Sequence, residues 1–312
     1  AQKISDNQGC PRAKDYDDTA QELISIANTW YRCLLATQDA FPGSTAEPEM
    51  VNLAWDRACE ELKVAVRLTP DIAKLIMRRG SQMRGVLKTK VRALVELIFG
   101  FESGQNKKII RKNRQRAEDL KEGMGYSYKV SLCLHFHSEL TFCRNSRTLP
   151  HSARESSKGR LVIQKSTNSM WFNSRRDEGA MHPELFGPRL PKPTLALVLT
   201  AIECSVDQWA SGIKTDVPFT AADYRSVYLE HIRVLEEFEK ATAPRRILDN
   251  ILTRLHNIGR QVHFSFFHSG AQPISAVKKA GISSAVLEAA ILEYDEDENT
   301  ESDGEDGERS DT

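Results

Sequence analysis

The chain has 312 residues, of which 40% are apolar and 28% charged, and its 43 Lys and Arg residues balance its 43 Asp and Glu residues. That length supports one large domain or two smaller ones, each with its own core. No apolar run approaches the roughly 20 residues that a membrane-spanning helix needs, and six scattered cysteines without a Cys-x-x-Cys pair are typical of reduced thiols. We therefore expect an intracellular protein that does not enter a membrane.

Four helices are predicted in the first half of the chain from apolar residues that recur every three or four positions. They cover residues 17–40, 48–63, 70–99 and 107–122. Asp17 or Asp18 is expected to cap the first helix, because a carboxylate there accepts hydrogen bonds from free amides of the first turn. Thr69, followed by proline, starts the third helix, which we expect to be interrupted at Gly80. Residues 1–16 are polar and are predicted to be disordered.

The second half is predicted to be helical as well, with an extended, proline-rich connector over residues 183–193. The predicted helices cover residues 162–172, 195–209, 221–242, 247–258 and 283–292. We expect Thr194 to cap the second of these, Thr220 to form a capping box with Asp223, and Gly259 to end the fourth. No repeat and no strand pattern is present, so the predicted fold class is an all-α, multi-helix globular bundle.

The domain boundaries follow from these elements and from composition. We expect one helical domain over residues 17–276 and a C-terminal helix within residues 277–292. Residues 293–312 are too acidic to bury themselves and are predicted to be disordered. Within the domain, residues 130–157 and 261–267 are rich in Phe, His, Ser and Leu and lack helical periodicity, so we expect irregular, insert-like loops there.

Five strings of the sequence carry a family resemblance. They are RACEELKV, LTPDIAKLIMRRGSQMRGVLKTKVRALVELIFGF, MWFNSRRDEGAMHPELF, LPKPTLALVLTAIECSVDQWASG and FTAADYRSVYLEHI. Together they resemble an uncharacterised protein family of mushroom-forming fungi (basidiomycetes), domain of unknown function 6532, over residues 12–276. The resemblance implies a fungal, non-secreted protein. It implies no catalytic residue, because the family is known only as sequence.

The two insert-like segments depart from the pattern of that family. The family runs with little delay from the equivalent of Gly125 into the helix before Met170, and from Arg260 directly into His268. Here VSLCLHFHSELTFCRNS and QVHFSFF intervene. We hypothesise that both segments are translated, unspliced introns of the gene sequence. Tryptic peptides from the native organism that contain Cys133 or Phe264 would disprove this hypothesis.

No motif of a known enzyme class is present: there is no Gly-x-Ser-x-Gly, no His-Glu-x-x-His, no P-loop and no dinucleotide-binding glycine pattern. We assign no catalytic residue and no cofactor, and a non-enzymatic protein is favoured. Cys133, His135, His137 and Cys143 are residue types that zinc accepts, but their spacing matches no common zinc finger or ribbon. Neither a metal site nor a small-molecule ligand is predicted.

Charge is strongly segregated along the chain. Residues 71–121 hold fourteen Lys and Arg against five Asp and Glu, whereas residues 293–312 hold eleven acidic residues against one arginine. Cations on two successive helices can neutralise phosphates, so we predict contact with nucleic acid. The string KKIIRKNRQR also resembles a nuclear-import signal, which favours a nuclear adaptor protein. The predicted contact residues are Arg78, Arg79, Arg84, Lys88, Lys90, Arg92, Lys107, Lys108, Arg111, Lys112, Arg114 and Arg116.

Other interpretations of these charges remain open. The cations could simply form solvated surfaces of the helices, and the acidic tail could serve only to keep the protein soluble. The tail is expected to compete with polyanions for the basic helices, and Thr300 and Ser302 are candidate phosphosites that would make it more negative.

An alternative function is a protein–protein interaction or oligomerisation module without nucleic-acid binding. One apolar stripe of the helix over residues 221–242 would pack against a partner helix or a second copy of the chain. The stripe consists of Tyr224, Val227, Tyr228, Ile232, Leu235 and Phe238.

Overall fold

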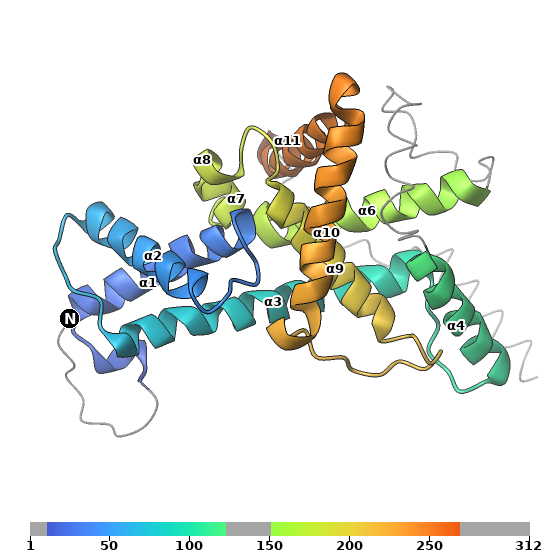
Figure 1. Cartoon of the computed structure of the whole chain (residues 1–312), viewed down its shortest axis with the longest axis horizontal. Helices are drawn as coiled ribbons and strands as arrows, with labels where there is room; N and C mark the ends of the chain where they lie inside the picture. The colour runs from blue at the N-terminus through green and yellow to red at the C-terminus, as the bar shows by residue number, and fades with distance from the viewer. Residues whose placement is uncertain (1–10, 123–150, 269–312) are drawn as a thin grey trace, which may run out of the picture. The chain divides into compact units, whose positions relative to one another are not determined.

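A computed structural model of the chain describes residues 11–122 and 151–268, with side chains over 11–122 and 158–261. This part of the chain consists of α-helices joined by turns and contains no strand (Figure 1), so the all-α prediction is confirmed. The helices are α1 (Asp18–Thr37), α2 (Ala46–Leu62), α3 (Pro70–Phe99), α4 (Lys107–Lys121), α6 (His151–Trp171), α7 (Glu178–Met181), α8 (Pro183–Phe186), α9 (Lys192–Asp207), α10 (Ala221–Thr242) and α11 (Ile247–His268), with 3-10 turns η1 (Ala13–Asp15) and η4 (Ala243–Arg245).

The chain divides into two compact units, residues 1–265 and 266–312. The helices above lie in the first unit, apart from the last three residues of α11. Its folded part begins at η1, and Tyr16 is buried, so structure starts earlier than the predicted boundary at residue 17. The predicted helix over residues 283–292 and the acidic tail lie outside the described residues. In the described part, no helix has the length and apolar character to cross a bilayer.

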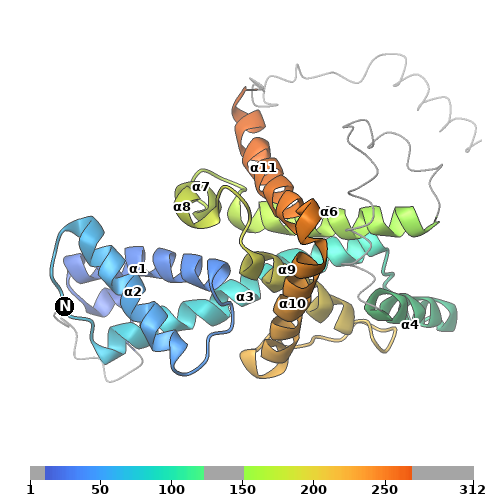
Figure 2. The same cartoon turned by 45° about the horizontal axis from the view of Figure 1, so that its top comes forward.

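Helix α9 lies at the centre of the first unit. Twelve of its sixteen residues are buried, and α3, α10, α1, α6 and α4 all contact it (Figures 1 and 2). A helix with apolar side chains all round belongs in a core rather than at a surface. None of the sixteen residues of α9 is exposed, so the helix has no solvent-facing stripe. The other helices therefore pack around α9, each against a different side of it.

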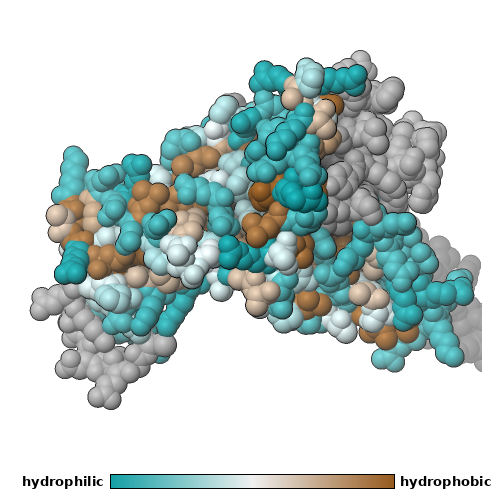
Figure 3. All heavy atoms as spheres, viewed as in Figure 1, coloured by the Kyte–Doolittle hydropathy of each residue, from teal (hydrophilic) through white to brown (hydrophobic). Residues whose placement is uncertain are grey.

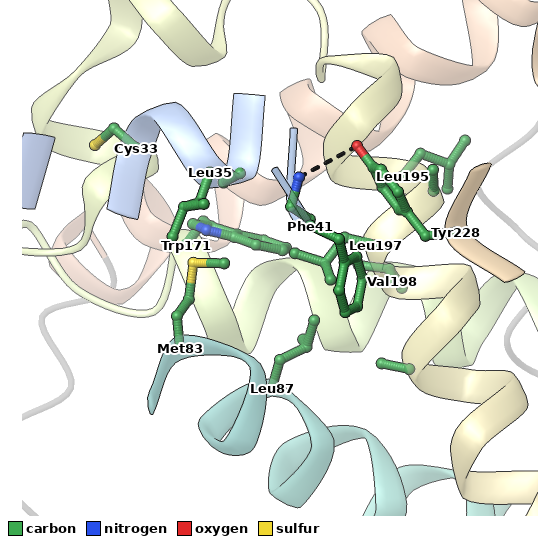
Figure 4. Close-up of a cluster of buried hydrophobic side chains, with 14 of the residues drawn as sticks. Cys33, Leu35, Phe41, Met83, Leu87, Trp171, Leu195, Leu197, Val198 and Tyr228 are labelled. Carbon is green, nitrogen blue, oxygen red and sulfur yellow. Dashed lines mark hydrogen bonds between the residues drawn. The ribbon is translucent and has the colours of Figure 1, made fainter. Parts of the chain in front are cut away.

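The side chains around α9 form one continuous core. Figure 4 shows Trp171 from the end of α6 between Leu35 of α1 and Met83 of α3, with Val198 of α9 beside them. All four are buried, and burial of each large apolar side chain contributes about 1.5–3 kcal/mol to stability. From α10, Tyr228 enters the same core, where its hydroxyl accepts a hydrogen bond of 3.4 Å from a backbone amide that precedes Phe41.

Three predicted helix starts are confirmed by their capping contacts. Asp17 Oδ1 accepts a hydrogen bond of 2.8 Å from the amide of Ala20. Thr69 Oγ1 accepts one of 3.4 Å from Ile72, and proline follows Thr69 as the first residue of α3. Thr220 caps α10 in the same way, through the amide three residues ahead. Each contact spans only three residues, so local chemistry decides it.

Two glycines that were predicted to break or end helices lie inside continuous helices. Helix α3 runs through Gly80, and α11 continues past Gly259. A Cβ at Gly80 would lie 3.4 Å from Leu35, and one at Gly259 would lie 2.8 Å from the ring of Phe172. Both glycines therefore serve close packing between helices, and the two predictions of helix ends are wrong.

Thr194 does not cap α9. The helix begins two residues earlier, and the Thr194 hydroxyl donates a buried hydrogen bond of 2.7 Å to the carbonyl of Ala36 in α1. The connector before it, predicted to be extended over residues 183–193, begins with the single helical turn α8. Two parts of the predicted insert-like loops are also helical: residues 151–157 begin α6, and residues 261–267 continue α11. Residues 130–150 lie outside the described part.

Candidate nucleic-acid interface

Helix α4 carries six of the twelve predicted contact residues, and two of them are lysines in its first turn. Asn106 caps the helix by accepting a hydrogen bond of 2.9 Å from the amide of Lys108. The first turn of α4 contains two lysines and no acidic residue; α6 and α9 also lack an acidic residue there, whereas α1, α2, α3 and α10 have at least one. The positive end of a helix dipole favours anions, so two lysines in this turn cost helix stability. That cost is offset when an anion binds there.

Asn113 fixes one face of α4 against the turn after α9. Its side chain is fully buried and donates hydrogen bonds to the carbonyls of Glu102, at 2.8 Å, and Gly212, at 3.1 Å. Its Oδ1 also accepts one of 3.2 Å from the amide of Glu102. Gly212 has a φ of 85°, and a Cβ there would lie 2.2 Å from the carbonyl oxygen of Ile110. The backbone approach is therefore close enough to set the orientation of α4.

The other end of α4 is held by a network of charged and polar groups. Lys121 Nζ lies 2.6 Å from Asp207 Oδ1 and 4.0 Å from Glu203 Oε1, both on α9. Tyr224 of α10 donates to the second oxygen of Asp207 at 2.8 Å, and His231 Nε2 lies 3.1 Å from Glu203 Oε2. Burial opposes the charged form of Lys121, but the hydrogen bond to Asp207 and the two carboxylates outweigh it and raise the pKa of Lys121.

Four of the six predicted contact residues on α3, Arg84, Lys88, Lys90 and Arg92, bind other parts of the chain. Arg84 is 8% exposed and donates from Nη1 to the carbonyl of Ala40 at 2.9 Å. Burial lowers the pKa of Arg84, while the neighbouring Tyr31 and Glu47 oppose this shift. Lys88 Nζ lies 2.8 Å from Asp216 Oδ1 and donates to a backbone carbonyl at 2.6 Å. These side chains connect α3 to the segments before α2 and α10.

The remaining α3 cations do not form one cluster with α4. Lys90 donates to the carbonyl of Ser169 in α6, and Arg92 Nη1 lies 3.9 Å from the same aspartate that Lys88 contacts. Arg79 donates to Gln82, and both it and Arg78 lie in the first half of α3. At 1.5 Å per residue, this places Arg78 about 30 Å along the axis from the end of α3 that leads to α4.

On α4 itself the six predicted cations divide into two groups. Lys112 pairs with Glu102, and the hydrogen bond from Lys112 lowers the pKa of that carboxyl. Arg114 donates to the carbonyl of Ser211 at 3.1 Å, and Arg116 donates to the carbonyl of Gly100. The second group, Lys107, Lys108 and Arg111, is exposed, and the side chains of these three residues form no hydrogen bond or ion pair with another described residue. We call this second group the α4 basic cluster.

A family model described as a domain of unknown function (DUF6532) matches residues 26–238 of the chain. The chain belongs to this family. Neither the curated proteins nor the solved structures that were compared gave a match. The matched range begins inside α1 and ends inside α10. The DUF6532 region therefore contains the central helix α9, helix α4, and the two sets of contacts that hold α4, those of Asn113 and those of Lys121.

The apolar stripe of α10 packs inside the DUF6532 region. Tyr224, Tyr228 and Leu235 are buried, and the other three stripe residues pack against the same core. The stripe therefore covers α9 rather than facing solvent. Within the described residues no group of three or more potential metal ligands comes together, and the Cys133–Cys143 segment lies outside them.

Sequence reasoning missed the anchors of α4. Asn113 is buried and holds α4 in place, whereas the exposed Gln115 donates a hydrogen bond of 3.0 Å to Asp119 Oδ1 within the helix. A helical-spacing signal was present, because Asn113, Ala117 and Leu120 recur at positions that share one face, and all three are buried. Because Asn113 is polar and most other residues of α4 are hydrophilic (Figure 3), the pattern does not stand out as a buried face.

Proposed function

We propose that this DUF6532 protein is a non-enzymatic helical adaptor that contacts the phosphates of nucleic acid through the α4 basic cluster. One observation carries the proposal: three cations are exposed without a partner among the described residues, at the positive end of a helix. Lys107 and Arg111 stand one turn apart, where like charges repel by about 0.2–0.5 kcal/mol. A polyanion removes both this repulsion and the unfavourable interaction with the helix dipole.

The rest of the structure supports this role by holding α4 still. Asn113 fixes the middle of the helix and Lys121 fixes its end, so the basic cluster projects from a rigid base. A cluster on a fixed helix loses less conformational entropy on binding than cations on a free segment. Arg84, Lys88 and Lys90 hold α3 to other segments of the chain and are therefore not included in the proposed contact surface.

The test is binding of the full chain to mixed-sequence duplex DNA and RNA at 50 and 200 mM salt. The triple variant Lys107→Gln, Lys108→Gln, Arg111→Gln is expected to bind more weakly, because each lost phosphate contact lowers the slope of log K against log salt by about 0.9 for duplex DNA. The slope should therefore fall by up to about 3.

The matched control changes three other exposed cations on α10, η4 and α11: Lys240→Gln, Arg245→Gln and Arg254→Gln. It alters the net charge of the chain by the same amount. Equal weakening in both triple variants would show a diffuse charge effect and refute the assigned surface. Binding that does not depend on salt, or no binding, would refute the proposal itself.

Two further properties are proposed with this function. The basic cluster lies within KKIIRKNRQR, which supports a nuclear location, and a fluorescent fusion of the triple variant that stays nuclear would refute it. The sequence strings of the family resemblance support an origin in a basidiomycete fungus. The net charge of about −10 over residues 293–312 supports competition with nucleic acid, which predicts tighter binding when these residues are removed.

A further inference from the structure

His256 on α11 is a buried histidine in an apolar environment. It is 4% exposed, and the ring of Phe172 meets it edge-on with 5.8 Å between ring centroids. The backbone after α8 closes another side: a Cβ at Gly187 would lie 3.3 Å from His256 Nε2. Within the described residues neither ring nitrogen makes a hydrogen bond of good geometry. A buried polar group in this state destabilises the fold, so it calls for an explanation.

The packing around His256 leaves the ring little freedom to reach a partner. On one side, Gln164 of α6 donates to the carbonyl of Leu255 at 3.0 Å. On the other, the amide of Leu190 donates to the carbonyl of Leu252 at 3.1 Å. These two contacts hold α11 against α6 and against the segment after α8. The ring therefore reaches water or a counter-charge only when α11 moves.

The charges near His256 also disfavour its protonated form. Phe172, which follows α6, and Gly187, which follows α8, contact the ring and are uncharged. Burial is the largest cause that lowers the pKa of His256; Asn257 opposes the shift, and Arg260 on the same helix adds to it. Because the folded-state pKa lies below the unfolded value of about 6.5, the ring takes up a proton more readily once it is exposed. Opening is therefore favoured as the pH falls below that value.

We propose that His256 is a proton-sensitive switch that loosens α11 from α6 under mildly acidic conditions. Helix α11 carries the chain across the boundary between the two compact units at residues 265 and 266. Protonation would thus act on the helix that leads out of the first unit, while the α1–α3 and α9 core stays folded. This inference is independent of nucleic-acid binding.

The test is hydrogen exchange of the full chain at pH 7.5 and 5.5, expressed as protection relative to unstructured peptides at the same pH. For one proton with an open-state pKa of about 6.5, protection of α11 amides is expected to fall between these pH values by a factor of at most about ten. Amides of α2, which packs on α1 away from His256, serve as the internal reference and should change less than about twofold, on the same linkage argument.

Two variants remove the titrating group while filling its space: His256→Phe and His256→Gln. Both are expected to abolish the pH effect in α11, whereas His231→Gln, at another buried histidine, should retain it. If His256→Phe does not fold, the result for His256→Gln tests the proposal. The proposal is overturned if α11 protection in the unaltered chain does not depend on pH, or if the effect persists in the folded His256 variants.

Discussion

The guanidinium of Arg84 lies 4.9 Å from the centre of the Phe41 ring, so a cation from the middle of α3 is stacked inside the protein. Arg84 belongs to the longest basic stretch of the sequence, where exposure to a polyanion is the natural expectation. Instead, the planar guanidinium of Arg84 stacks on the Phe41 ring and donates a hydrogen bond to the carbonyl of Ala40. This pair separates the cations that hold the fold together from those on α4 that are available to a ligand.

Replacement of Arg84 is expected to destabilise the fold without weakening nucleic-acid binding by the folded protein. Arg84→Ala leaves the Ala40 carbonyl unpaired and removes the stacked contact, which should cost about 2–3 kcal/mol in the free energy of unfolding. Arg84→Lys should restore little of this stability, because the ammonium group of lysine lacks the planar guanidinium that stacks on the Phe41 ring. Urea unfolding measures the first effect, with the exposed Arg57→Ala as the control. A loss under about 0.5 kcal/mol, the usual effect of a surface substitution, would contradict the assigned role.

Asn113 is expected to be the most important single contact of α4. Asn113→Ala removes three hydrogen bonds to backbone groups, each worth about 0.5–1.5 kcal/mol, so the free energy of unfolding should fall by about 2–4 kcal/mol. Hydrogen exchange of α4 should accelerate at the same time. Gln115→Ala, two residues away on the exposed side, is the matched control and should change stability by less than about 0.5 kcal/mol. Equal effects of both variants would argue against the anchor.

Two glycine-to-alanine substitutions should shift stability in opposite directions. Gly85 lies in α3 with open space where a Cβ would be, so Gly85→Ala is expected to stabilise the protein by about 0.5–1 kcal/mol. Gly212 has a left-handed backbone and no space beside Ile110, so Gly212→Ala should cost more than about 2 kcal/mol. Thermal unfolding of both variants checks the pair. A stable Gly212→Ala protein would show that α4 does not approach the turn so closely.

Two buried thiols are expected to resist alkylation. Burial raises the pKa of Cys33 to about 12 and that of Cys204 to about 11, and only the thiolate reacts. Iodoacetamide at pH 8 should therefore leave both residues unmodified in the native protein and label both in 8 M urea. Peptide mass spectrometry measures each site separately. Rapid labelling of Cys33 under native conditions would mean that α1 opens far more often than its packing implies.

The acidic end of the pH range provides a separate check on α11. Since burial lowers the pKa of His256 in the folded state, overall stability should decline as the pH falls from about 7 to 5. The His256→Phe protein is expected to lose less stability over this interval than the unaltered chain. Urea unfolding at both pH values measures the difference. The same decline in both proteins would assign the acid sensitivity to other groups.

The sequence by itself determined the helical class, most helix positions and the caps at Asp17, Thr69 and Thr220, because each cap joins groups three residues apart. Only the tertiary structure decided which cations face solvent, since the partners of Arg84 and Lys88 lie 44 and more than 120 positions away in the chain. The same holds for Gly80, Thr194 and Gly259. These residue types are common at helix ends, but here each residue packs against another helix. That helix is distant in the sequence, so the local sequence pattern does not predict the contact.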